Sequence, residues 1–245
     1  MSVTIKGRVA LITGASRGLG RATAERFAKE GAKVILTGRG EEALREAAAA
    51  VKKLAAREND VLAVPCDVTD EAHVKALFQK AFDALGRVDV LVNNVGYWLM
   101  KPLHETTLGE WSQVLNTKTR AAFLCSREAL PGMLERGEGH IVNVASGGAR
   151  NGAANFAAFC ASEFGLLGFT QSLAEEVRGR GVHVSCLMPM GSIESPKTVS
   201  RITGGDPSTW LDHDGLVDGI LLMATQGPRA LTTELIVTPP SPNYG

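Results

Sequence analysis

A glycine-rich octet close to the amino terminus has residue types and a spacing that suit phosphate binding. The octet lies between an apolar run and a helical pattern. Its sequence is Thr13-Gly14-Ala15-Ser16-Arg17-Gly18-Leu19-Gly20. In such a loop Gly14 can make a tight turn, Gly18 lets the backbone approach a phosphate, and Gly20 lets helix and strand pack closely. Because the first N–H groups of a helix have no partner within it, they can bind an anion. The octet therefore predicts a nucleotide-binding site.

A cation stands at the end of the second apolar run, where the nucleotide ribose is expected. The run closes with Leu36-Thr37-Gly38-Arg39. A carboxylate at this point would accept a hydrogen bond from the ribose 2′-OH of NAD, whereas a cation favours the 2′-phosphate of NADP. Arg39 is such a cation, and Arg17 in the octet is a second, although each alone also fits a solvated surface charge. Together they predict NADP(H) as the cofactor; the alternative is that no cofactor is bound.

The octet and several later segments resemble the short-chain dehydrogenase/reductase family over almost the whole chain. The TGxxxGxG spacing is similar to that family's fingerprint, and Asn93-Asn94-Val95-Gly96 resembles its NNAG motif. Ser146 follows the fifth strand, where relatives keep a catalytic serine, and 164–173 resembles the back half of the catalytic helix. The resemblance and the octet together predict these cofactor-binding residues: Gly14, Ser16, Arg17, Gly18, Leu19, Gly20, Arg39, Asp67, Val68, Asn93 and Gly96.

Three of the four positions that run proton transfer in such relatives hold other residues here. Relatives use a tyrosine to give or take the proton, a serine to hold the substrate oxygen, a lysine to bind the cofactor ribose, and an asparagine. By spacing, Ser146 is retained, and the tyrosine, lysine and asparagine positions hold Phe159, Glu163 and Lys118. A phenyl ring has no proton to give, and general acid catalysis is worth roughly 10²–10⁴ in rate. Ordinary tyrosine-driven ketone reduction is therefore not expected.

Positions 118 and 163 are best interpreted together. In the family geometry they face each other across the site, so a lysine and a glutamate there keep the local charge near balance. An unpaired buried carboxylate is costly, and a neighbouring ammonium offsets much of that cost. We hypothesise that Lys118 and Glu163 form an ion pair; the alternative is that both point to solvent. Ser146, Glu163 and Lys118 are the predicted catalytic residues.

Apolar side chains are expected to line a substrate pocket beside these positions. Trp98 lies where relatives line the pocket, Phe159 fills the place of the absent tyrosine, and Met190 is an extra residue after the sixth strand. The alternatives are a loop anchor for Trp98 and plain core packing for Phe159. The stretch near 188–214 is rich in Pro, Gly and Ser and lacks periodicity, which at the carboxyl end of a strand predicts a substrate lid.

Apolar runs alternate with helical patterns along the chain, and these elements must position the site. Strands are expected near 8–13, 33–37, 61–65, 88–92, 139–144, 182–187 and 234–237, and helices near 18–30, 41–58, 70–85, 108–134, 155–179 and 215–225. The alternation predicts βαβ units, and continuous apolar strands indicate a sheet covered on both faces. The expected fold is one α/β domain over 1–245: a Rossmann-type, doubly wound, seven-stranded, mostly parallel sheet with helices on both faces.

Composition argues against several other classes of protein. The 245 residues include 26 basic and 26 acidic side chains, a formal net charge of zero, which favours neither a nucleic acid nor a membrane partner. The four cysteines form no CxxC pair, which argues against zinc and against a disulfide framework. We expect a soluble, cytoplasmic protein with a small-molecule substrate, and the relatives imply a homo-oligomer, a dimer or tetramer. His104 and His140 are interpreted as ordinary loop histidines.

Three functions are compatible with this altered site. The first is an unconventional enzyme acting on a small carbonyl-type substrate, with non-redox chemistry favoured: Glu163 or a substrate group handles protons, while Ser146 and Lys118 stabilise an oxyanion. The second is a catalytically silent subunit or a nucleotide-sensing binding protein. The third is an NADP(H)-dependent oxidoreductase with a proton donor other than tyrosine. The fold alone does not choose among them.

Overall fold

Seven strands form one parallel sheet in the computed structural model, which describes residues 4–194, 206–227 and 229–240. The strand order is β3-β2-β1-β4-β5-β6-β7, and every neighbouring pair is parallel. The predicted seven-stranded, doubly wound α/β fold is confirmed. The strands are β1 (Val9–Thr13), β2 (Lys33–Gly38), β3 (Val61–Pro65), β4 (Val90–Asn93), β5 (Gly139–Val144), β6 (Val182–Pro189) and β7 (Glu234–Val237).

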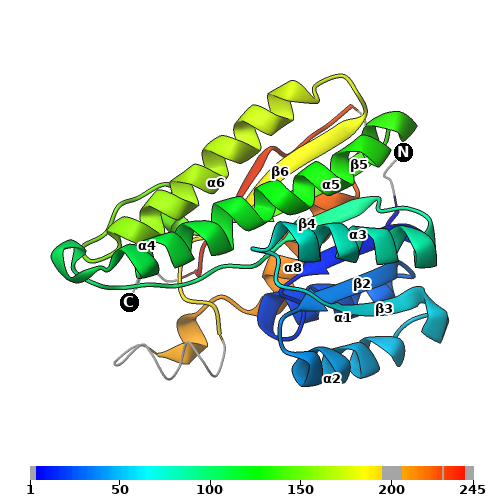
Figure 1. The fold of residues 1–245 in the computed structure, drawn as a ribbon, viewed down its shortest axis with the longest axis horizontal. Helices are drawn as coiled ribbons and strands as arrows, with labels where there is room; N and C mark the ends of the chain where they lie inside the picture. Colours follow the sequence, from blue (N-terminus) through cyan, green and yellow to red (C-terminus); the bar gives the residue numbers. More distant parts are fainter. Residues whose placement is uncertain (1–3, 195–205, 228, 241–245) are drawn as a thin grey trace.

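Helices cover both faces of the sheet (Figure 1). One face carries α1 (Gly18–Lys29), α2 (Glu41–Lys52) and α8 (His213–Ala224). The other carries α3 (Glu71–Leu85), α5 (Ala121–Arg136) and α6 (Ala157–Glu176), and α4 (Leu108–Leu115) precedes α5. Shorter turns are η1 (Glu58–Asp60), η2 (Leu103–Glu105), η3 (Asn116–Arg120), η4 (Gly147–Ala149) and η5 (Pro207–Thr209).

The central strands are mostly apolar because their side chains are buried on one face of the sheet or the other. Along β1, Ala10 and Ile12 pack in the cluster that holds α1 and α8, whereas Val9 and Leu11 pack in the cluster that holds α3 and α5. Successive side chains of a strand point to opposite faces, so a sheet covered on both sides needs apolar residues at every position.

One predicted helix is interrupted at a point that matters for the site. The pattern over 108–134 predicts a single helix, but the structure has α4, then the π-helical turn η3, then α5. A π turn adds a residue to the helical repeat and changes the direction of the side chains that follow. Lys118 lies within this turn and is buried. The helix predicted over 41–58 also ends early, at Lys52.

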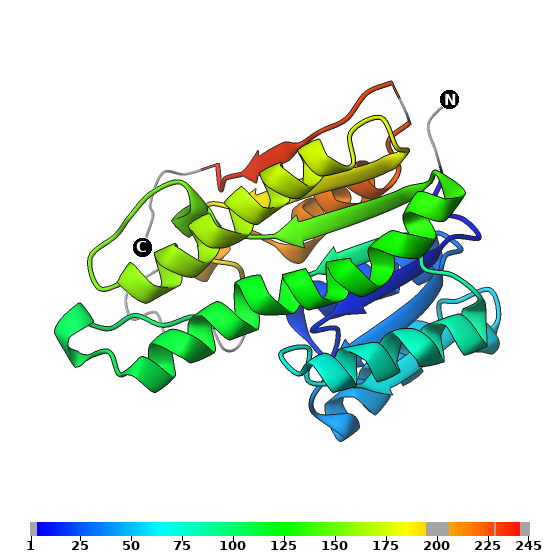
Figure 2. The same cartoon turned by 45° about the horizontal axis from the view of Figure 1, so that its top comes forward.

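The carboxyl ends of β1 and β4 lie side by side at the centre of the sheet. The chain leaves these two strands toward opposite halves of the sheet, which makes this edge the switch point where ligands bind in doubly wound folds. Figure 2 shows α5 (green) and α6 (yellow-green) running beside each other over the half of the sheet that holds β4, β5 and β6. Of the predicted lid near 188–214, residues 195–205 lie outside the described residues.

Candidate active site

The glycine-rich loop leaves the start of α1 open to an anion. Arg17 is extended at the N-cap, no side chain caps the helix, and its first turn holds no acidic residue. Gly14 and Gly18 have φ values of +65° and +56°, in the left-handed region that favours glycine. At Gly20 a Cβ would lie 2.6 Å from Nδ2 of Asn94, so the loop packs too closely for a side chain.

Ser16 carries a buried polar atom for which the described residues offer no partner. Its Oγ makes no hydrogen bond within the described part of the chain. The hydroxyl lies against Gly38, where any Cβ would collide with it, and the next residue, Arg39, is exposed. Because buried hydroxyls are normally hydrogen-bonded, an unsatisfied one next to the strand end that carries an exposed arginine fits the phosphate and hydroxyl groups of a nucleotide.

Asp67 lies close to Arg39 at the adjoining strand end. Partial burial raises the pKa of Asp67, but hydrogen bonds from the backbone N–H and the Oγ1 of Thr69 and the charge of Arg39 outweigh burial, so that its pKa lies below the ordinary value. The two hydrogen bonds measure 3.0 and 2.8 Å. Val68, the next residue, is buried. Asp67 is therefore an anion held in place beside the cation expected to read the ribose.

The two asparagines after β4 have different environments. Asn93 is buried, and its amide donates to Oγ of Ser126 at 3.2 Å and to Oδ1 of Asn143 at 2.8 Å. Asn94 instead joins this loop to the glycine-rich loop: its backbone N–H donates to Oγ1 of Thr13 at 2.9 Å and its Nδ2 to the carbonyl of Thr13 at 3.1 Å. The side chain of Asn93, a predicted cofactor contact, is thus occupied inside the fold.

Lys118 and Glu163 face each other across the interior of the site. The Lys118 Nζ lies 3.0 Å from Oε1 of Glu163 and donates a hydrogen bond of 3.0 Å to the carbonyl of Val144. Lys118 is 7% exposed and Glu163 is 0% exposed. Neither carboxylate oxygen accepts a well-directed hydrogen bond from the described residues, so the contact is an ion pair by distance. The hypothesised pair is present, and the alternative of two solvent-facing side chains is wrong.

The ammonium of Lys118 also approaches the loop after β4. A Cβ at Gly96 would lie 2.9 Å from Nζ. Because this exposed position is a glycine, there is room for the ammonium. Three segments therefore surround the cation: the end of β5 through Val144, α6 through Glu163, and the loop after β4 through Gly96. The cost of removing the Lys118 charge from water is offset here by the nearby oxygen atoms of Val144 and Glu163.

Ser146 and Phe159 flank the short turn after β5. The Oγ of Ser146 accepts a hydrogen bond of 3.1 Å from the backbone N–H of Gly148. A Cβ at Gly148 would lie 2.9 Å from the ring of Phe159 and 3.2 Å from that Oγ. Phe159 is half-buried, so its ring is not wholly core. On the other side of the turn, Met190 Cγ lies 3.4 Å from the position of a Cβ at Gly147.

Three aromatic rings form a row that ends beside Ser146. The ring centroids of Phe159 and Phe156 are 5.8 Å apart, and those of Phe156 and Trp98 are 5.5 Å apart. Both contacts are edge-on, the favoured arrangement of aromatic pairs. The structure thus connects two predicted pocket residues, Trp98 and Phe159, through a third ring that the sequence did not single out.

Comparison with known proteins identifies the family. The family model described as short chain dehydrogenase matches residues 8–202. The chain belongs to the short-chain dehydrogenase family. It is 38% identical over 234 residues to the ketoacyl reductase HetN of Nostoc sp., covering 96% of this chain and 79% of that protein.

Solved structures of short-chain dehydrogenases are similar over nearly the whole chain. A metagenomic short-chain oxidoreductase in complex with NADP has a TM-score of 0.84 at 32% identity, covering 97% of this chain and 99% of its own. L-Sorbose reductase from Gluconobacter frateurii, complexed with NADPH and L-sorbose, has a TM-score of 0.88 at 28% identity, covering 98% of both chains. These likenesses extend over nearly the whole chain and agree with the fold described above.

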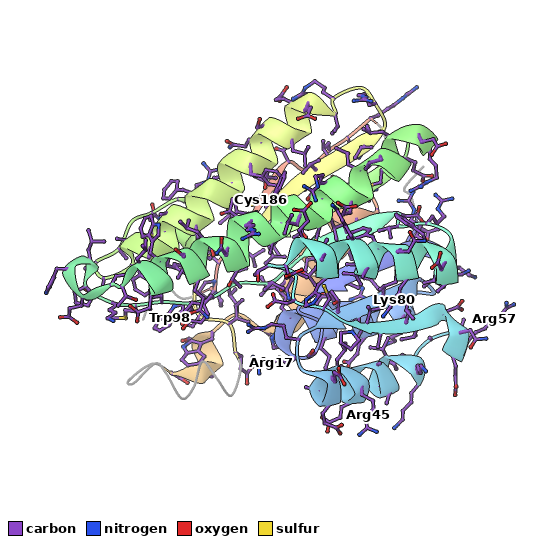
Figure 3. The ribbon with its side chains drawn as sticks, viewed as in Figure 1. Arg17, Arg45, Arg57, Lys80, Trp98 and Cys186 are labelled. Atoms are coloured by element: carbon purple, nitrogen blue, oxygen red, sulfur yellow. The ribbon has the colours of Figure 1, made fainter. Side chains whose placement is uncertain are left out.

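As a short-chain dehydrogenase, the chain gathers its predicted residues at the carboxyl edge of the sheet, where Figure 3 shows Arg17 and Trp98. Sequence reasoning missed Asn94 and Phe156. For Asn94 the available signal was the doublet at the end of β4, since consecutive residues in extended chain point opposite ways and only one can turn inward. For Phe156 it was the three-residue spacing to Phe159, which brings side chains together on a helix.

Two buried side chains lie outside this group. Cys186, in β6, lies within reach of the charges of Lys118 and Glu163, but burial dominates and raises the pKa of its thiol to about 12, which disfavours the reactive thiolate. His140 was expected in a loop, and that prediction is wrong: it lies in β5, 4% exposed, near the amino ends of the strands and away from the site.

None of the helices described is long and apolar enough to cross a membrane.

Proposed function

We propose that this short-chain dehydrogenase binds NADP(H) at the glycine-rich loop. The open start of α1 supports this, as does the Ser16 hydroxyl, which has no partner among the described residues. The exposed Arg39, which follows the Gly38 that this hydroxyl packs against, supports it too. Support also comes from the metagenomic oxidoreductase, a structural neighbour over almost the whole chain that was solved in complex with NADP. The residues proposed to hold the cofactor are Gly14, Ser16, Arg17, Gly18, Leu19, Gly20, Arg39, Asp67, Val68 and Gly96, with Asn94 in place of the inward-facing Asn93.

We further propose an unconventional enzyme that acts on a small carbonyl-type substrate by non-redox chemistry. The observation that carries this proposal is the buried Lys118–Glu163 ion pair next to a site that has a phenyl ring where relatives have a phenol. A phenyl ring cannot protonate a carbonyl, and the lysine ammonium is already engaged by a carboxylate and a carbonyl. The groups left for catalysis are the Ser146 hydroxyl and the positive field of Lys118, and the proton that leaves the carbon next to the carbonyl would pass to a group of the substrate itself.

Ser146 is suited to hold the substrate oxygen. Its Oγ accepts from the N–H of Gly148, which leaves the hydroxyl proton free to donate to a carbonyl or enolate oxygen. Stabilising negative charge on that oxygen is the main demand of isomerisation, dehydration or carbon–carbon cleavage next to a carbonyl. The row Trp98–Phe156–Phe159 and Met190 would supply apolar walls, and the segment near 188–214 of this single domain would act as the lid.

A catalytically silent, NADP(H)-binding subunit is the second candidate. Complete burial of Glu163 favours it, because a carboxylate without exposed surface cannot exchange a proton with a substrate unless the site opens. The third candidate, a reductase with another proton donor, has support from relatives such as the ketoacyl reductase HetN.

One experiment separates the three. The protein is first titrated with NADPH and NADH by fluorescence, and tighter binding of NADPH is expected. It is then incubated in D₂O with NADPH and a panel of ketones and β-keto thioesters, with NADPH absorbance and proton NMR followed together. Exchange or conversion next to the carbonyl without NADPH oxidation, lost in Ser146→Ala, supports the main proposal. NADPH oxidation supports the reductase, and binding without any turnover supports the silent subunit.

We also propose that the protein is a cytoplasmic homo-oligomer that pairs through α5 and α6. Each helix exposes a phenylalanine, Phe123 at 43% and Phe164 at 46%, and Gly165 and Gly168 leave the surface of α6 flat enough for close packing. Light scattering behind a size-exclusion column tests the proposal: wild-type protein is expected as a dimer or tetramer, and Phe164→Glu as a smaller species.

A further inference from the structure

His213, the first residue of α8, faces the glycine-rich loop. A Cβ built on Gly18 would point into space whose only near neighbour among the described residues is Nε2 of His213, at 3.9 Å. His213 is half-buried, and its ring makes no hydrogen bond or ion pair with any residue that the structure describes. The imidazole thus borders the space that a phosphate would enter on approaching Gly18.

Contacts on both sides hold His213 in this place. The Asp212 carboxylate accepts the backbone N–H of Gly215 at 2.8 Å and caps α8 directly at the histidine. Just before it, the N–H of Leu211 donates to the carbonyl of Ser192 at 2.9 Å, which joins the segment to the chain after β6. Along the helix, Arg26 of α1 pairs with Asp218 of α8 at 2.7 Å. These contacts hold the backbone at the start of α8, which carries the ring.

The amino-terminal ends of α1 and α8 differ in capping and charge, and the difference favours an anion at α1. Both helices follow strands of one parallel sheet and begin at its carboxyl edge. The first turn of α8 is already capped by Asp212 and carries Asp214, whereas the first turn of α1 has neither a capping side chain nor an acidic residue. An anion is therefore favoured at α1 and disfavoured at α8. His213 contributes the imidazole that α8 directs toward this position.

We propose that His213 binds the pyrophosphate of the dinucleotide by donating a hydrogen bond from Nε2 above Gly18. The inference rests on the proposed NADP(H) binding and adds a residue to it. An imidazole N–H donating to a phosphate oxygen is a charge-assisted hydrogen bond, which makes His213 a recognition residue for the part of the cofactor that NADPH and NADH share.

The test compares His213→Ala with Arg39→Ala by fluorescence titration of both dinucleotides. Loss of one such hydrogen bond is expected to raise the Kd of His213→Ala about tenfold to a hundredfold, and equally for NADPH and NADH. Arg39→Ala is the matched control, since it should weaken NADPH far more than NADH. His213→Gln, which keeps an N–H near the position of Nε2, should stay within about twofold of wild type.

A fragment separates pyrophosphate recognition from general damage. Adenosine 2′-phosphate has the 2′-phosphate but no pyrophosphate, so its affinity should be the same for His213→Ala and wild type. An unchanged dinucleotide Kd in His213→Ala overturns the inference and leaves the proposed NADP(H) binding standing. An equal loss of fragment affinity also overturns it, because the effect would then be structural. Wild-type protein that binds neither dinucleotide overturns both proposals.

Discussion

The Lys118 ammonium and the Glu163 carboxylate meet at 3.0 Å although they come from different helices, and both are buried. The cation enters from the π turn before α5 and the anion from α6. Neither residue is tolerable at its position alone, since a single buried charge without a partner is strongly destabilising. The two positions therefore behave as one unit, and any change to the site has to treat them together.

A double-mutant cycle measures the interaction free energy between Lys118 and Glu163. Lys118→Met leaves a buried carboxylate without its cation and is expected to lower the free energy of unfolding by about 3–5 kcal/mol. Glu163→Gln should also destabilise, by a smaller amount, because the amide is neutral. The combined variant should be more stable than the sum of the single losses predicts, by at least about 1 kcal/mol. Urea unfolding of the four proteins gives these values, and strict additivity would show that the two charges do not interact.

If the protein works by the proposed non-redox chemistry, turning it into a tyrosine-dependent carbonyl reductase requires three substitutions rather than two. Phe159→Tyr with Glu163→Lys supplies a phenol and an ammonium, but it places the new ammonium against Lys118 in a buried site, where like charges repel. We expect this double variant to be poorly folded. Adding Lys118→Asn removes the repulsion, and this triple variant should oxidise NADPH with simple ketones at a rate at least about 10²-fold above wild type.

The triple variant is assayed by NADPH absorbance, with circular dichroism as the check on folding. The triple variant that additionally carries Ser146→Ala is the control, since the serine must still hold the substrate oxygen. A well-folded triple variant without activity would argue that the substrate pocket, and not the missing phenol and ammonium, prevents reduction.

The contact between Gly148 and the Phe159 ring makes a sharp stability prediction. A methyl at position 148 would lie 2.9 Å from the ring, so Gly148→Ala has to displace it and is expected to cost about 1–3 kcal/mol. Adding Phe159→Leu should recover part of that loss. Gly152→Ala is the matched control: a Cβ there meets nothing within 4 Å, so little change is expected. Thermal unfolding compares them, and equal Tm values for the two alanine variants would contradict the contact.

His140 predicts a loss of stability in mild acid. Its Nδ1 lies 3.2 Å from a guanidinium nitrogen of Arg8, which can only donate, so Nδ1 accepts and Nε2 donates to the carbonyl of Gln226, also at 3.2 Å. Burial, followed by the charges of His183 and Arg8, lowers the pKa of His140 to about 4. In the unfolded chain the pKa is about 6.5. Burial and the charge of Arg8 lower the pKa of His183 in the same direction.

The sign follows from these values. Above about pH 6.5 His140 is neutral in both states and the protein has its full stability. As the pH falls from about 6.5 toward 4, His140 becomes protonated in the unfolded chain but stays neutral in the folded protein. The free energy of unfolding therefore falls by about 3 kcal/mol. Urea unfolding across this range should give a shallower slope for His140→Gln, with a residual slope from His183. If wild type and His140→Gln show the same dependence of unfolding free energy on pH, other groups cause the loss of stability in acid.

Local signals in the sequence were enough for the fold and for one end of the site. The glycine spacing, the alternation of apolar runs with helical patterns, the arginine after β2 and the residues at positions 159 and 163 are all visible within a few residues of chain. Such features depend on backbone geometry and periodicity, which neighbouring residues determine. The seven-stranded, doubly wound sheet followed from them, whereas its strand order came from the structure.

Tertiary structure alone decided which side chains meet. The sequence offered Lys118 and Glu163 as a pair or as two surface charges, and the π turn that directs Lys118 inward settled the choice. It also placed His213 against Gly18 and buried His140 at the opposite edge. These contacts join segments far apart in the chain, and a shift of one residue in a helix or strand redirects every side chain after it. Local patterns carry no information about that shift, so only the packed structure could supply it.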